Sequence, residues 1–289
     1  MRRRDFILLM LVCLVWAINV IVGKVVLSGM GVPPFYYAAI RFLLVAVLLS
    51  KLLLPIPRQI GRILLAGLFM GAGHFGFLFL GLTSSSPSAA SIVLQFGIPI
   101  TTILSVCFLG EKLSSFRAVG ILLALCGVIV VIWDPSGFSL SPGLFAILIS
   151  TTSLASGAVL LKRIDAIAPL RLQAWVGFVS FLPLSLASVF LEHGQMASTL
   201  AGGWTIATAI VFSAIVVTGW AHTTYFSLLQ RYEANLVVPL TLAMPLMTMV
   251  LGVAFTGDKI DARIVTGTII AIAGIWIVIS AKPRRHIVT

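Results

Sequence analysis

The sequence has very few charged residues and no extended polar segment. Only 9% of its 289 residues are Asp, Glu, Lys or Arg, and 60% are hydrophobic, whereas a soluble domain carries about 25% charged residues. No linker, low-complexity tract or polar domain interrupts the apolar runs. This composition excludes a soluble globular protein and predicts one all-α integral membrane domain embedded in a lipid bilayer.

Reactive and titratable groups are also scarce. The three cysteines, Cys13, Cys107 and Cys126, lie in apolar stretches and fit no metal motif, so we interpret them as small apolar side chains. No His/Asp or His/Glu metal spacing and no pair of carboxylates falls within a span, which argues against an enzyme, catalytic residues, a metal or a cofactor. All eight acidic residues lie near span ends, which argues against exchange of cationic drugs for protons.

Apolar stretches of spanning length dominate the chain. A transmembrane helix needs about 20 mostly apolar residues, and turn-forming residues separate ten such stretches. The expected spans are 5–27, 34–54, 61–82, 88–109, 116–133, 142–161, 171–191, 204–229, 235–255 and 261–281.

Basic residues are distributed unevenly between the two sides of the membrane. If the N-terminus is cytoplasmic, 15 of the 19 Lys and Arg residues lie on the cytoplasmic side, so both termini are expected there, in a multi-pass protein of the inner membrane.

The net charge of +11 is spread between the spans rather than gathered in a patch, which argues against a nucleic-acid partner. The spans hold no central cluster of Lys or Arg, which argues against a phosphorylated substrate. We expect Lys24 and Arg41, near the outer ends, to extend toward the interface.

A signature occurs twice in the chain. Gly110-Glu111-Lys112 follows an apolar helix with Pro99, and Gly257-Asp258-Lys259 follows one with Pro245, 147 residues later. We expect each acidic residue to pair locally with its neighbouring lysine. A glycine series at helix-packing spacing recurs at the same offset. Its members are Gly120, Ala124 and Gly127, then Gly267, Ala271 and Gly274.

The duplication predicts two repeats of five helices each, residues 1–138 and 139–289. Because five is odd, the second repeat must enter the membrane from the opposite side, which gives an inverted repeat. Such duplicated bundles are typical of secondary transporters that work by alternating access, with the substrate between the repeats. We expect the protein to function as a monomer.

Several short motifs occur in an order that is characteristic of one transporter family. They are Trp16-Ala17-Ile18-Asn19 with Lys24, Arg41-Phe42, the run from Ser88 to Gln95 leading to Pro99, Gly110-Glu111-Lys112, and Arg231-Tyr232-Glu233-Ala234 before Pro239 and Pro245.

Over essentially its whole length the chain resembles the EamA family of the drug/metabolite transporter superfamily. The resemblance implies ten helices in a five-plus-five inverted repeat, a central cavity, and export of amino acids or related metabolites. Exporters of the YddG type, which carry aromatic amino acids, and cysteine-pathway exporters are the relatives it suggests. The sequence departs from the pattern at Asp258, where the family usually has Glu, and the sixth helix offers Ser153 where the first has Trp16 and Asn19. The substrate of a relative therefore cannot be transferred to this chain.

Two histidines stand at equivalent depths of the two repeats. His74 lies midway along the third span and His222 midway along the eighth, 148 residues apart. A buried histidine is often a structural group. A matched pair is also suited to binding a substrate carboxylate or to titrating near neutral pH.

The first span presents Trp16 and Asn19 on one face. Asn19 can both donate to and accept from an amino acid, or it can form a hydrogen bond between helices. Trp16 can stack on an aromatic substrate or fill the core. Tyr225, one turn from His222, and Ser153 complete this part of the predicted lining.

Each repeat also combines a polar residue and a proline on one helix face. Gln95 precedes Pro99, and Thr241 precedes Pro245, by one turn. Because proline removes a backbone hydrogen bond and kinks a helix, the two prolines are candidate gates, although a static bend explains them equally well. Gln95 and Thr241 are added to the predicted substrate site.

The sequence therefore predicts a secondary transporter that exports neutral, in particular aromatic, amino acids or related metabolites, with facilitated diffusion preferred over proton antiport. The alternatives are export of another small solute, such as a drug, and proton-coupled antiport. A channel or a scaffold is less consistent with the inverted repeat.

Overall fold

The computed structural model describes residues 1–110, 114–134, 139–165, 167–232 and 234–280. Helices dominate this part of the chain, and the two strands comprise two residues each. The elements of the first half are α1 (Arg3–Lys24), η1 (Val25–Gly29), α2 (Pro34–Leu48), η2 (Ser50–Leu53), α3 (Ile60–Leu68), η3 (Phe69–Gly73), α4 (His74–Leu82), α5 (Pro87–Gln95), α6 (Gly97–Leu109), α7 (Ser115–Ile132) and β1 (Trp133–Asp134).

The second half has a corresponding series of elements. They are β2 (Ser139–Leu140), α8 (Pro142–Leu161), α9 (Pro169–Leu191), α10 (Gln195–Val211), η4 (Phe212–His222), α11 (Thr223–Arg231), α12 (Ala234–Leu240), α13 (Ala243–Thr256) and α14 (Ala262–Ser280). β1 and β2 pair antiparallel, with Trp133 opposite Leu140.

Within the described residues, nine helices are long and apolar enough to cross a membrane. The expected span 34–54 is the exception, because α2 ends at Leu48 and a short 3-10 turn follows, ahead of Pro55 and Pro57. At 1.5 Å per residue, its 15 residues reach about 22 Å, less than the roughly 30 Å hydrocarbon core. The expected ten spans of full length are therefore not observed.

Proline and glycine fix the helix ends that the sequence indicated. Pro34, Pro87 and Pro142 each occupy the first turn of a helix, where the missing N–H has no intrahelical partner. Gly110 and Gly257 are left-handed residues, with φ of 68° and 67°, that end α6 and α13. The duplicated Gly-acid-Lys signature therefore begins at the same kind of helix end in both halves.

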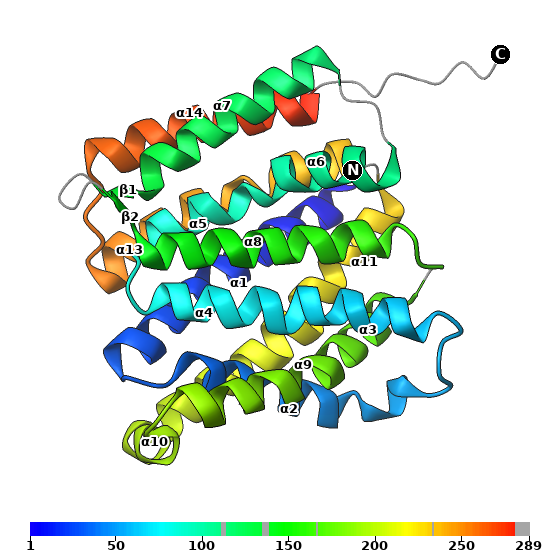
Figure 1. Ribbon diagram of the computed structural model, residues 1–289, viewed down its shortest axis with the longest axis vertical. Coiled ribbons are helices and arrows are strands. Elements are labelled where there is room, and N and C mark those ends of the chain that lie inside the picture. Colours follow the sequence, from blue (N-terminus) through cyan, green and yellow to red (C-terminus); the bar gives the residue numbers. More distant parts are fainter. Residues whose placement is uncertain (111–113, 135–138, 166, 233, 281–289) are drawn as a thin grey trace.

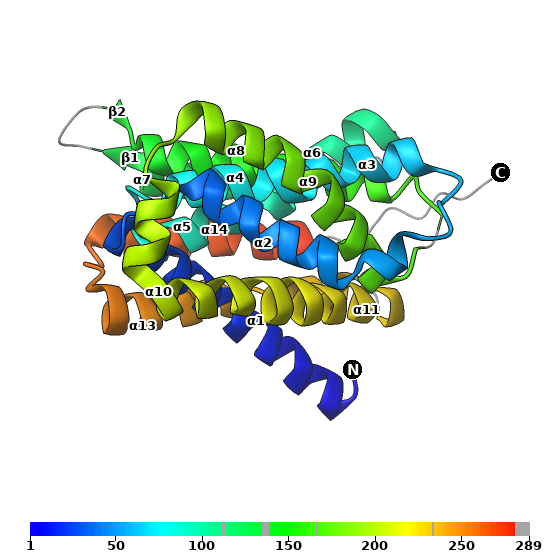
Figure 2. The ribbon, with the colours of Figure 1, turned by 90° about the horizontal axis from the view of Figure 1, so that it is seen from below.

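The two halves of the chain interleave. The helices that pack most extensively are α7 with α14, α2 with α9, α4 with α8, and α1 with α13, and each pair takes one helix from each half. Figure 1 shows α7 and α14 side by side at one end of the bundle. Seen at right angles in Figure 2, α3, α4 and α8 lie on one side of the molecule and α1, α11 and α13 on the other.

The close contact between α7 and α14 depends on the predicted glycines. A Cβ atom on Gly127 would lie 2.7 Å from the carbonyl oxygen of Gly267 and closer still to the nitrogen of Ala271. A Cβ atom on Gly120 would lie 2.8 Å from the carbonyl oxygen of Gly274. The backbones of the two helices therefore touch, as expected for small-residue packing in membranes.

We expect Gly127→Ala to destabilise the protein by about 1–3 kcal/mol, the usual cost of overpacking. Gly61, in α3, is the matched control, because a Cβ atom there meets nothing within 4 Å. Gly61→Ala should leave the unfolding temperature unchanged or raise it, since alanine is the better helix former. Thermal unfolding of the purified variants in detergent tests this. Equal unfolding temperatures for the two variants would show that the glycine contact is unimportant.

Candidate functional site

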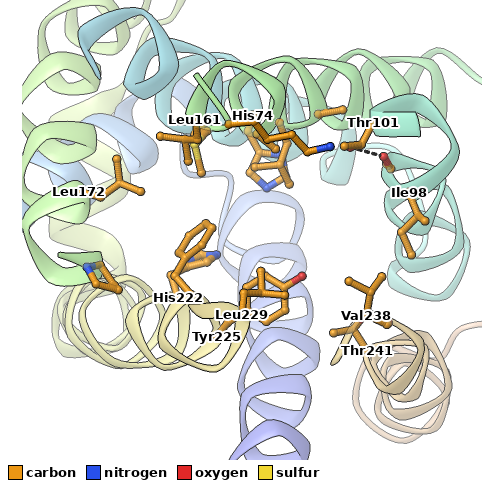
Figure 3. A pocket seen from close by; sticks show the side chains of 18 of the residues that line it. His74, Ile98, Thr101, Leu161, Leu172, His222, Tyr225, Leu229, Val238 and Thr241 are labelled. Atoms are coloured by element: carbon orange, nitrogen blue, oxygen red, sulfur yellow. Dashed lines mark hydrogen bonds between the residues drawn. The ribbon is translucent and has the colours of Figure 1, made fainter. Parts of the chain in front are cut away.

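A cavity of about 860 Å³ lies between the two sides of the bundle. Its walls come from α1, η3 and α4 to α9, and from η4, α11, α12 and α14. The volume falls in the range of about 300–1,000 Å³ that is typical of small-molecule sites. Figure 3 shows residues from both halves of the chain around the same space.

Six of the predicted site residues line this cavity. They are Trp16, His74, Gln95, His222, Tyr225 and Thr241. Figure 3 labels four of them: His222 and Tyr225 lie on one wall, and His74 and Thr241 lie on two others. The cavity therefore collects side chains from helices that are far apart in the sequence but equivalent in the predicted duplication.

Both histidines adjoin an unusual stretch of helix. The π-helical segment η3 ends at Gly73, next to His74, and the segment η4 ends at His222 itself. A π-helix is rare and is frequently found at functional sites, because it displaces side chains from the regular helical register. The two halves place these irregular turns at matching positions.

Ser150 fixes the ring of His74. The Ser150 hydroxyl donates to the carbonyl oxygen of His74 at 2.7 Å, and the same Oγ lies 2.8 Å from His74 Nδ1. Because a hydroxyl has one proton, Nδ1 is the donor of the second bond, and it also faces the carbonyl oxygen of Ser150 at 3.3 Å. A neutral His74 ring therefore carries its lone pair on Nε2.

Aromatic rings form one wall of the cavity. The Trp16 ring lies 5.4 Å from His222 and 5.0 Å from Tyr225, centroid to centroid. Phe75 lies 4.6 Å from His74 and 6.0 Å from His222, so it joins the two histidines. The indole N–H of Trp16 is buried and makes no hydrogen bond within the described residues.

Asn19 and Ser153 are not among the residues that line the cavity. Asn19 is 5% exposed, and its Oδ1 accepts a hydrogen bond from Ser213 at 3.0 Å. The Ser153 hydroxyl donates to the carbonyl oxygen of Phe69 at 2.7 Å, at the start of η3. In this conformation both side chains form hydrogen bonds between helices. For Asn19 this is the second of the two roles considered from the sequence.

The two predicted prolines coincide with interruptions of their helices. The helix that contains Pro99 is broken between α5 and α6, and the one that contains Pro245 between α12 and α13. Proline at position 245 leaves the carbonyl of Thr241 without its helical N–H donor. This carbonyl accepts from the Met244 N–H at 3.0 Å and from Gln95 Nε2 at 2.9 Å, so a polar residue of one half helps to satisfy the break in the other.

The cavity reaches the surface at one end of the bundle, which we call the open end. Its lining there includes the exposed residues Lys162, Asp165 and Gln230. Toward the opposite end the lining stops at Trp16 on α1 and at Leu94 on α5.

The opposite end, which we call the closed end, is joined by polar contacts around Lys24, Ser88 and Asp258. Asp258 Oδ2 accepts hydrogen bonds from the Ser88 N–H at 2.8 Å and from its hydroxyl at 2.5 Å. Lys24 Nζ donates to the carbonyl oxygens of Leu82 and Thr83 at 3.1 and 3.3 Å. The Asp258 contact links the second half of the chain to the first, whereas the Lys24 contacts join elements within the first half.

Two expectations for charged residues need correction. Asp258 binds Ser88 of the other half rather than Lys259, because the N-terminus of α5 offers it an unpaired N–H; Glu111 and Lys112 lie outside the described residues. Arg41 does not extend to the interface but is 0% exposed. The sequence contained a signal of this burial, because Arg41 lies seven residues after Pro34 and therefore about 10 Å along the helix from its start.

Comparison with known proteins identifies the family. A sequence profile of the EamA-like transporter family matches residues 4–133 and again 141–280. This chain belongs to the EamA-like transporter family. It is therefore a multi-pass membrane transporter, and the resemblance stated from the sequence motifs is confirmed.

Two relatives have informative names. A protein of Salmonella typhimurium, "Probable amino-acid metabolite efflux pump", is 30% identical and aligns over 99% of this chain and 98% of its own length. A protein of Escherichia coli with the same name is 29% identical over 96% of this chain and 95% of its own. A solved crystal structure matches with a TM-score of 0.62 at 19% identity over 96% of both chains, which supports the fold alone.

In this EamA-like transporter, we expect Asp258→Asn to loosen the closed end. Losing charge-assisted hydrogen bonds of about 1.5–3 kcal/mol should raise the amide exchange rate around Ser88 roughly tenfold or more. Asp261→Asn is the control, because Asp261 bonds to the Ile264 N–H and pairs with Arg263 away from α5. Hydrogen–deuterium exchange measured on peptides that cover residues 84–92 checks this. Unchanged exchange in Asp258→Asn would contradict the assigned contact.

Proposed function

We propose that this protein exports neutral, in particular aromatic, amino acids or closely related metabolites across the inner membrane by alternating access. The observation that carries the proposal is a cavity between interleaved halves that reaches the surface at the open end and stops before the closed end. The names of the Salmonella and Escherichia relatives favour the same class of substrate.

The lining chemistry suits a small zwitterion or neutral solute. The wall combines aromatic rings with imidazole, amide and hydroxyl groups. Asp165, at the open end, is the one acidic residue among the described lining residues. A cationic drug exchanged for protons needs a buried carboxylate, so this lining favours amino acids over cationic drugs.

The orientation of the carrier follows from its basic residues. Lys162 and Arg117 line the open end, where the positive-inside rule places the cytoplasm. We therefore assign the described conformation to an inward-open state, with both termini cytoplasmic. The family profile matches two segments, and the irregular helices recur in both, which supports a five-plus-five inverted repeat that exchanges the roles of the two ends. We propose the monomer as the transporting unit, since the cavity is built within one chain.

Within this proposal Pro99 and Pro245 act as hinges of the gate. Both lie just after interruptions of spanning helices, where a change in bend angle breaks no regular hydrogen bond. The hydrogen bond from Gln95 to the Thr241 carbonyl then joins the two hinges directly.

The proposed function is tested by counterflow in proteoliposomes. Labelled L-phenylalanine should accumulate in vesicles preloaded with unlabelled substrate, and a panel of unlabelled amino acids should compete with it. Competition by drugs or sugars, without competition by amino acids, would favour the other-solute alternative. Linear, non-saturating flux without counterflow would indicate a channel.

We expect alanine at His74 or His222 to lower substrate affinity about tenfold, as loss of one hydrogen bond of about 1.4 kcal/mol would. His193→Ala is the matched control, because His193 is exposed on the loop after α9. Counterflow rates measured over a range of substrate concentrations, with folded yield checked by gel filtration, give the comparison. If both cavity variants transport like His193→Ala, the histidines have no part in substrate binding.

We also expect transport to be facilitated diffusion. Because the described lining holds no carboxylate away from the open end, proton coupling would have to depend on its histidines alone, whereas proton-coupled carriers normally use a buried carboxylate. An imposed pH gradient should therefore leave the final substrate distribution unchanged in proteoliposomes. Uphill accumulation driven by that gradient would establish proton-coupled antiport instead, with the cavity histidines as the groups to test next.

A further inference from the structure

Arg41 is a buried cation that the sequence motifs did not explain. It lies in the middle of α2 with 0% of its surface exposed, between α4 and η4. Its Nε and Nη2 atoms donate to Thr218 Oγ1 at 3.1 and 2.7 Å. A charge at this depth is costly, so ionised side chains inside membrane proteins are normally paired.

The guanidinium has no anionic partner in the part of the chain that the structure describes. Its only hydrogen-bond acceptor there is the Thr218 hydroxyl, and its Nη1 atom is buried without a hydrogen bond. A guanidinium offers five N–H donors in a planar fork that matches a carboxylate. Arg41 therefore keeps an unused donor group and an uncompensated charge.

One aromatic ring stands between this charge and the cavity. The Arg41 guanidinium carbon lies 3.9 Å from the centroid of the Phe75 ring. Phe75 itself lines the cavity and lies between His74 and His222. The cation–π contact with Phe75 replaces part of the lost hydration, but it is much weaker than an ion pair in a dry site.

We propose that Arg41 binds the carboxylate of the substrate after the Phe75 ring turns aside. This proposal rests on the proposed function, since it assigns the group that recognises the acid end of an amino acid. In the empty carrier the guanidinium stacks on Phe75, and in the loaded carrier Nη1 donates to a carboxylate oxygen. The lone pair on His74 Nε2 is then suited to accept from the substrate ammonium group.

The local backbone favours such a movement. The π-helical segment η3 ends two residues before Phe75, so the ring sits where the helix is already irregular. Thr218, the present partner of Arg41, belongs to η4, the equivalent irregular segment of the second half. Substrate binding at Arg41 would therefore act on both segments together.

The proposal predicts discrimination between an acid and its amide. Ligand affinity is measured from thermal stabilisation of the purified protein by L-phenylalanine, L-leucine and L-serine and by their carboxamides. We expect at least one acid to stabilise the wild-type protein, with at least about 30-fold tighter binding than its carboxamide. Arg41→Gln should weaken binding of that acid by about 30-fold or more and leave binding of the amide within about threefold.

Arg231→Gln is the matched control, since Arg231 is exposed at the end of α11. It should bind both ligands like the wild type. If Arg41 serves packing alone, Arg41→Gln will weaken the acid and the amide equally, and this result would overturn the proposal. Stabilisation of the wild type by none of the acids, or equally by acids and amides, would overturn it as well.

A second variant covers the case in which Arg41→Gln does not fold. Phe75→Leu keeps an apolar side chain but removes the ring that competes for the guanidinium. It should bind the acid several-fold more tightly than the wild type while the amide is unaffected. Tighter or weaker binding of both ligands alike would contradict the proposal.

The binding measurement is separate from the transport assay. Counterflow of amino acids without acid–amide discrimination would retain the proposed function and reject the role of Arg41. Discriminating binding without counterflow would retain the carboxylate site and reject amino-acid transport.

Discussion

The structure depends on one constraint, which is that each polar backbone group at membrane depth needs a partner inside the protein. Regular helices satisfy this requirement by themselves, whereas interrupted helices need help from a neighbour. The breaks before Pro99 and Pro245 and the π-helical segments beside His74 and His222 all border the cavity. Where a break removes a helical donor, as at the Thr241 carbonyl, a tighter turn from Met244 and a side chain of the opposite half, Gln95, both donate to it.

The same constraint divides the bundle into regular and irregular parts. The α7–α14 pair has uninterrupted helices and backbone contact at Gly127, so its geometry tolerates little change. Several helices around the cavity are interrupted, at η3, at η4, between α5 and α6 and between α12 and α13, whereas α8 and α9 run unbroken. A change of shape is therefore most easily accommodated at these interruptions, while α7 and α14 keep their contact.

Local patterns predicted the parts of the structure that local physics determines. Apolar runs and prolines indicated the helices, the glycine series indicated the α7–α14 contact, and equal depth indicated His74 and His222. The sequence did not reveal the partners of Arg41 and Asp258, because a charged residue is read as exposed unless its neighbours in space are known. The shortness of α2 was missed because the leucines of the segment 49–54 continue the apolar run, although this segment is not α-helical.

The polar nature of the closed end has a consequence for the energetics of switching. Asp258 with Ser88, and Lys24 with two carbonyls, form bonds that water can replace when the contact opens. Such exchanges change the free energy by about 1.5–3 kcal/mol per bond to a charged group, whereas exposing apolar surface costs about 25 cal/mol for every Å². A closed end built from hydrogen bonds therefore keeps two conformations close in free energy. A carrier needs this balance, because a ligand can shift an equilibrium only by its difference in affinity for the two states.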